Sequence, residues 1–141
     1  MSEIEELSDS LKERNYYGFK INKWTSNRCV QEQVKFSTML KGLSNGYWPV
    51  AEFDPEPDND NHNYRIDVGW FSYEDFEPKY AFEIDGTVSP HSVKKLNMLP
   101  DNIERVVISK SNSKSSVENK VNDHLPNDFY HIVARDYTIE Y

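Results

Sequence analysis

Two short alternating runs within residues 64–86 place the strongest limits on what this chain can fold into. In the first, YRIDVGW, apolar residues alternate with Arg65, Asp67 and a glycine; in the second, YAFEID, they alternate with an alanine, Glu83 and Asp85. A period of two is typical of a half-buried β-strand. The segment between the runs is polar and acidic and closes with a proline, which predicts a β-hairpin.

The register of this hairpin decides which charged residues face one another. If the numbers of facing residues sum to 150, Asp67 lies opposite Glu83, and Arg65 lies opposite Asp85. Two carboxylates facing each other destabilise a sheet unless something offsets their charge. A divalent cation would offset it, because hard cations take oxygen ligands. The alternatives are an exposed sheet face on which these four charged residues are merely solvated, and an Asp85 that is only the ion-pair partner of Arg65.

Length and composition predict one compact domain. The 141 residues are 37% apolar, enough for a core without disulfides, and the single cysteine, Cys29, provides neither a disulfide nor a zinc site. No apolar run approaches the ~18 residues of a membrane-spanning helix. The N-terminus is acidic and lacks the features of a signal peptide. A cytoplasmic protein with no membrane partner is the expectation.

The net charge of −8 argues against loose, non-specific binding to nucleic acid, which depends on neutralising phosphates. It still allows a nucleic-acid enzyme in which bound metal ions and a local basic face meet the phosphates. The first 24 residues are predicted to form an amphipathic helix, from Ile4, Leu7 and Leu11, and an aromatic strap. This segment either docks on the domain formed by residues 25–141 or contacts a protein partner.

The rest of the chain predicts alternating helices and strands. A helix over residues 28–43 has an apolar stripe of Cys29, Phe36, Leu40 and Leu43, with Glu32 at its edge and directed toward the sheet. A strand at 47–53 and the hairpin follow. Ser89 and a proline then begin a helix whose Lys95 is expected to project away from the core. A strand at 105–109, a helix near 117–125 and a strand from 129 complete the order.

The ionisable residues follow this order as Glu32, then Asp67, then Glu83-Ile84-Asp85. With the segments RIDVGW and AFEID, the chain resembles the PD-(D/E)XK nuclease superfamily, which includes restriction endonucleases and archaeal Holliday-junction resolvases. The resemblance covers about residues 28–110. It implies an α/β (α+β) fold with a restriction endonuclease-like αβββαβ core, in which helices flank a mixed central sheet.

The resemblance also implies a metal-dependent endonuclease that hydrolyses DNA phosphodiester bonds. Asp67, Glu83 and the carbonyl of Ile84 would hold Mg²⁺ or Mn²⁺, and Glu32 would add a water-mediated contact. The chain departs from the pattern at Asp85, where the family usually has a lysine that orients or deprotonates the attacking water.

Some members of the family have an acidic residue at the position of Asp85. Others take the lysine from a neighbouring element, for which Lys95 and Lys35 are the candidates. The alternatives are a catalytically inactive module of the same fold that binds protein or nucleic acid, and a small acidic interaction protein. Pairing with a second copy of the chain is a further expectation for its partners.

Overall fold

The computed structural model describes residues 2–11, 27–60, 63–86, 89–109, 126 and 128–134. Their elements are, in chain order, α1 (Glu3–Leu11), α2 (Asn27–Ser44), β1 (Trp48–Phe53), β2 (Ile66–Phe71), β3 (Pro78–Asp85), α3 (Pro90–Asn97), β4 (Glu104–Ser109) and β5 (Tyr130–Val133). The prediction of a mixed sheet flanked by helices is confirmed. The predicted aromatic strap and the helix near 117–125 lie outside the described residues.

The five strands form one sheet in the order β1-β2-β3-β4-β5. The pairs β1–β2 and β2–β3 are antiparallel, whereas β3–β4 and β4–β5 are parallel. A short turn suffices for an antiparallel pair, but a parallel pair needs a crossover, which α3 provides between β3 and β4. No described helix is long and apolar enough to cross a membrane.

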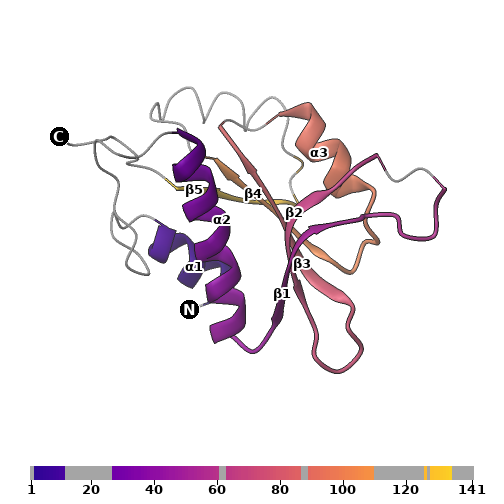
Figure 1. The fold of residues 1–141 in the computed structure, drawn as a ribbon, viewed down its shortest axis with the longest axis horizontal. Helices are drawn as coiled ribbons and strands as arrows, with labels where there is room; N and C mark the ends of the chain where they lie inside the picture. The colour runs from indigo at the N-terminus through magenta and orange to yellow at the C-terminus, as the bar shows by residue number, and fades with distance from the viewer. Residues whose placement is uncertain are drawn as a thin grey trace.

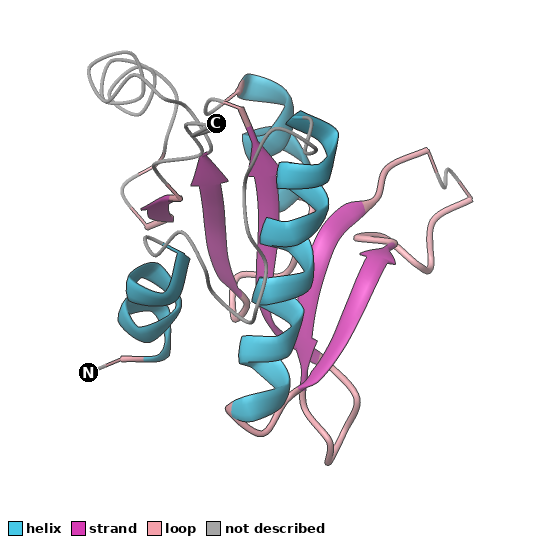
Figure 2. Cartoon of the chain, turned by 60° about the vertical axis from the view of Figure 1, so that its left-hand side comes forward, coloured by secondary structure: helices cyan, strands magenta, loops and turns pink. Residues whose placement is uncertain are grey.

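Helices cover both faces of the sheet. Figure 1 shows α1 and α2 on one side of the strands and α3 on the other, and Figure 2 shows α2 running along its face. The core is accordingly divided between the two faces, with Trp70 and Phe82 on the side of α2 and Leu96 and Val107 on the side of α3. Coverage on both sides explains why every residue of β4 after Glu104 is buried.

The sheet-facing side of α2 differs from the predicted apolar stripe. The helix buries Val34, Ser37 and Thr38, while Phe36 and Leu43 are each 47% exposed. The reason is Trp70, whose indole Nε1 donates a hydrogen bond to the carbonyl of Thr38 at 3.0 Å. A broad ring at the centre of this face requires small residues on the helix above it. The predicted stripe is therefore wrong at Phe36 and Leu43, while the side chain of Cys29 lies outside the described residues.

The N-terminal helix α1 is part of the same core. Leu7 and Leu11 are fully buried in the cluster that also contains Trp70. The Glu3 carboxylate accepts hydrogen bonds from the hydroxyls of Tyr47, at 3.0 Å, and Tyr80, at 2.8 Å. Burial and the nearby Glu3 charge raise the pKa of Tyr80 well above its usual value, so it remains a donor. Of the two expectations for this helix, docking on the domain is the one that the structure supports.

Candidate functional site

Asp67 and Glu83 meet on the neighbouring strands β2 and β3. From Val68 to Trp70 the facing residue numbers sum to 150, as predicted, and the ladder ends at Val68 and Phe82, one residue before Asp67 and Glu83. At this point hydrogen bonds from backbone amides to side-chain carboxylates replace the backbone–backbone hydrogen bonds between the strands. The Asp67 amide donates to Glu83 Oε2 at 2.9 Å, and the Ile84 amide donates to Asp67 Oδ2 at 2.8 Å. Each carboxylate is thus fixed by the opposite strand.

Lys95 on α3 joins this pair. Its ammonium forms an ion pair with Glu83 Oε1 and donates to the carbonyl of Arg65 at 3.0 Å. The Glu83 side chain is only 1% exposed and that of Lys95 14%. The prediction that Lys95 projects away from the core is therefore wrong. Ser92, Lys95 and Leu96 have the spacing i, i+3, i+4 and share the helix face that packs on the sheet.

The electrostatics of Glu83 follow from this crowding. Burial and then the charge of Asp67 raise the pKa of Glu83 to about 8, while Lys95 acts in the opposite direction. Burial also raises the pKa of Asp85, and the charge of Asp67 adds to that effect. The carboxylates of Asp67, Glu83 and Asp85 thus influence one another, with one lysine among them. The cluster favours a bound proton or an added cation.

Asp85 turns toward the beginning of α3. It accepts hydrogen bonds from the hydroxyl of Ser92 and, at 3.3 Å, from that of Ser89. Ser89 also caps the helix by accepting from the Ser92 amide at 3.2 Å. Hydroxyl donors and the positive end of the helix dipole favour an anion there. The predicted pairing of Asp85 with Arg65 is therefore wrong, and Arg65 instead lies 4.0 Å from Asp54.

The two remaining candidates on α2 lie elsewhere. Glu32 is exposed and stands two residues from the buried Val34, roughly 200° around the helix. Its predicted place beside the sheet-facing stripe is wrong because that stripe is on the other side. A water-mediated role for Glu32 stays a prediction, and among the described residues Glu32 makes no hydrogen bond or ion pair with the carboxylates of the site. Lys35 forms an ion pair with Glu52 of β1 at 2.6 Å, so Lys95 is the lysine at the site.

A serine–histidine pair that the sequence did not predict lies beside the site. Ser109 is the register neighbour of Asp85 on β4, and its hydroxyl lies 2.9 Å from Nε2 of His131 on β5. Ser109 is fully buried, and burial lowers the pKa of His131. The signal that could have found Ser109 is its place as the polar end of the apolar run RVVIS. The pair extends the polar row from β3 to β5.

The donor set fits a hard cation by chemistry and by charge. Asp67, Glu83 and the Ile84 carbonyl offer oxygen ligands, which Mg²⁺ and Mn²⁺ prefer. In the described part of the chain, Asp67 Oδ1 is the carboxylate oxygen of this pair without a hydrogen-bond or ion-pair partner. No group of three or more His, Cys, Asp or Glu side chains is arranged as a metal site among the described residues. A metal would thus need a main-chain or water ligand and would compete with Lys95 for Glu83.

Comparisons with known proteins assign no function to the site, so its chemistry is inferred from its geometry. A scan against protein-family models finds no match, and neither does a search of curated proteins or of solved structures.

Proposed function

We propose that this chain is a metal-dependent endonuclease-like protein that hydrolyses DNA phosphodiester bonds on a restriction endonuclease-like core. The observation that carries the proposal is the cluster of Asp67, Glu83 and Lys95, drawn from two adjacent strands and the helix that follows them. The order from α2 to β4, which is helix, three strands, helix and strand, supports the same assignment.

Each residue has a role in this proposal. Asp67, Glu83 and the Ile84 carbonyl would hold Mg²⁺ or Mn²⁺, and the bound metal would supply an acidified water and stabilise charge on the scissile phosphate. The family usually has a lysine at the position of Asp85. Here Lys95 would supply that positive charge instead, and its ammonium would orient the attacking water beside Glu83. The Asp85 carboxylate, which accepts from the hydroxyls at the start of α3, would accept a proton or a hydrogen bond from that water.

A catalytically inactive module of the same fold, which binds a protein or nucleic-acid partner, is the second candidate. The contact between Lys95 and Glu83 favours it, because the ammonium already occupies the carboxylate oxygen Oε1 that a metal would bind. The exposed position of Glu32 favours it as well. In this alternative the cluster only holds α3 against the sheet.

A cleavage assay separates the two. Purified full-length protein is incubated with single-stranded, duplex and branched DNA in Mg²⁺, in Mn²⁺ and in EDTA. We expect metal-dependent cleavage that falls by about a hundredfold or more in Asp67→Asn, Glu83→Gln and Lys95→Met. Lys94→Met is the matched control, since Lys94 is the exposed neighbour on α3 and contacts Tyr64 instead. A folded parent protein that leaves every DNA form intact contradicts the nuclease proposal and favours the inactive module.

A further inference from the structure

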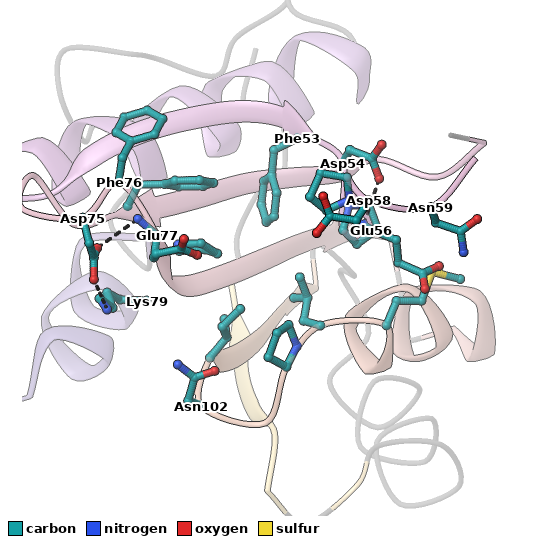
Figure 3. A pocket seen from close by; sticks show the side chains of 18 of the residues that line it. Phe53, Asp54, Glu56, Asp58, Asn59, Asp75, Phe76, Glu77, Lys79 and Asn102 are labelled. Carbon is teal, nitrogen blue, oxygen red and sulfur yellow. Dashed lines mark hydrogen bonds and ion pairs between the residues drawn. The ribbon is translucent and has the colours of Figure 1, made fainter. Parts of the chain in front are cut away.

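A second site lies away from the cluster of Asp67, Glu83 and Lys95. It is a cavity of about 1030 Å³ between three connecting segments, residues 54–60 after β1, residues 75–79 in the β2–β3 hairpin and residues 98–103 after α3. Figure 3 shows side chains from these segments around a common space. Pockets for small ligands have about 300–1,000 Å³, so this cavity has room for a short stretch of polypeptide.

The floor of the cavity is aromatic. The rings of Phe53 and Phe71 lie 5.2 Å apart, edge to face, and Phe76 continues the row at 5.2 Å from Phe71. Phe76 is 56% exposed and has a φ of 53°, a backbone conformation that costs energy for a phenylalanine. A large apolar side chain held at the surface beside a cavity is typical of a surface that binds an apolar group.

The rim of the cavity is acidic. Six carboxylates line it, namely Asp54, Glu56, Asp58, Asp60, Asp75 and Glu77, with one lysine. That lysine, Lys79, is paired with Asp75 at 3.3 Å. In Figure 3 the labelled acids form two groups, one on the hairpin and one on the segment after β1, with Phe53 between them. Positive charge is therefore favoured at both sides of an apolar centre.

We propose that this cavity binds a cationic peptide segment of a partner protein, with an apolar side chain on the phenylalanine floor and lysine or arginine side chains on both rims. The charge of the rim selects this occupant, because acidic groups repel the phosphates of DNA. The aromatic floor adds apolar contact and cation–π attraction for an arginine. The inference does not rest on the nuclease proposal, since it uses different residues and a different ligand.

The probe is a fluorescein-labelled peptide of sequence Arg-Lys-Phe-Leu-Lys-Arg, titrated with the full chain and followed by fluorescence anisotropy. Two further peptides test the two parts of the proposal. One replaces the basic residues by glutamate, and the other replaces phenylalanine and leucine by serine. We expect both to bind at least about tenfold more weakly than the first, because each lacks one half of the complementarity.

Variants locate the binding. Asp58→Lys and Glu77→Lys reverse one charge on each rim, and each should weaken binding about tenfold. Glu5→Lys is the matched control, because Glu5 is an exposed acid on α1, on the other side of the sheet. Phe76→Ser should weaken binding, whereas Tyr73→Ser should not, since Tyr73 is equally exposed on the same hairpin but packs against Trp48.

Three results would overturn the proposal: no binding of the basic peptide, equal binding of the acidic peptide, or an equal loss of affinity in Glu5→Lys and Glu77→Lys. The last would mean that only the net charge of the chain attracts the peptide. Cleavage of DNA is measured on the same variants and should not change, so that failure here is distinguished from failure of the nuclease proposal.

Discussion

The ammonium of Lys95 on α3 contacts the carboxylate of Glu83 on β3, inside a site where the glutamate is almost fully buried. The two residues lie on different elements, and the contact fixes α3 over the end of β3. It also supplies a cation beside Glu83-Ile84-Asp85, where the sequence has an acid in place of a lysine.

Lys95→Met should destabilise the fold. Removing one partner of a buried ion pair leaves an uncompensated charge and costs about 3 kcal/mol, unless the carboxylate takes up a proton. The pKa of Glu83 is about 8 with Lys95 present, so the free energy of unfolding, measured with urea, should fall by up to this amount only at pH 9 and above, and by much less at pH 6, where Glu83 holds a proton. In the double variant Lys95→Met/Glu83→Gln much of the loss should be recovered, and Lys94→Met should change stability by less than ~0.5 kcal/mol. Equal losses at Lys94 and Lys95 would show that the ion pair contributes nothing.

The raised pKa of Glu83 predicts a loss of stability as the pH rises. Glu83 titrates at about 8 in the folded protein and near 4.5 in the unfolded chain, so between these values the folded state holds the extra proton. Stability then decreases with pH through this window, by at most ~1.4 kcal/mol per pH unit for one proton.

A second titratable group, His131, affects the same measurement at lower pH, and the variant Glu83→Gln serves as the control. Burial lowers the pKa of His131, which adds stability as the pH rises toward its ordinary value of 6.5, so the clean window for Glu83 lies between 6.5 and about 8. Glu83→Gln should flatten the decrease in that window. A slope that is the same in parent and variant would assign the pH dependence to another group.

Divalent metal should stabilise the protein. A cation that binds the native cluster and not the unfolded chain raises the free energy of unfolding by about 2.7 kcal/mol at one hundred times its dissociation constant. Thermal unfolding in millimolar Mg²⁺ or Mn²⁺ should thus show a higher Tm for the parent and none of this rise for Asp67→Asn. If the Tm of the parent changes with neither ion, the proposed role of a bound metal is wrong. If the Tm rises but no DNA is cleaved, the site is vestigial.

Asp85→Asn should separate the charge of Asp85 from its hydrogen bonds. Asparagine retains an oxygen that accepts from the hydroxyls of Ser89 and Ser92, so stability should change by no more than ~1 kcal/mol. The carboxylate is lost, and the cleavage rate should fall by about a hundredfold if it helps to position the water. Full cleavage by the folded variant would reject the catalytic assignment of Asp85.

Gly42→Ala should test the packing of α2 against the sheet. A Cβ at Gly42 would overlap the indole ring of Trp70, which is fully buried and cannot move without repacking. Overpacking of this kind costs about 1–3 kcal/mol, to be measured by urea unfolding. Gly86→Ala is the control, since a Cβ at Gly86 meets no atom within 4 Å. A stable Gly42→Ala variant would mean that α2 can shift away from Trp70.

Local features of the sequence predicted the strands and the main helices. The alternation around Asp67 and Glu83 specifies two strands by itself, because successive residues of a strand point to opposite sides. Ser89, followed by a proline, begins α3 where predicted, since capping needs only the first turn of the helix. The hairpin register is also a short-range property, set by the turn and the pattern beside it.

The faces of the helices could not be predicted in this way. Apolar content alone places Phe36 against the sheet and directs Lys95 away from it. The structure has Thr38 against the ring of Trp70 and Lys95 against Glu83. In both cases a residue distant in the chain, with a bulky ring or a buried charge, selected the helix face that could accommodate it.

The sequence by itself thus determined where backbone elements begin and end and brought Asp67 opposite Glu83, because hydrogen bonding and side-chain alternation act over a few residues. Only the tertiary structure decided that Lys95 completes this cluster, that Asp85 turns to Ser89 and Ser92, and that Glu32 remains on the outer side of α2. These outcomes depend on how the helices settle on the sheet, where burying a carboxylate without a partner costs more than reorienting a surface lysine.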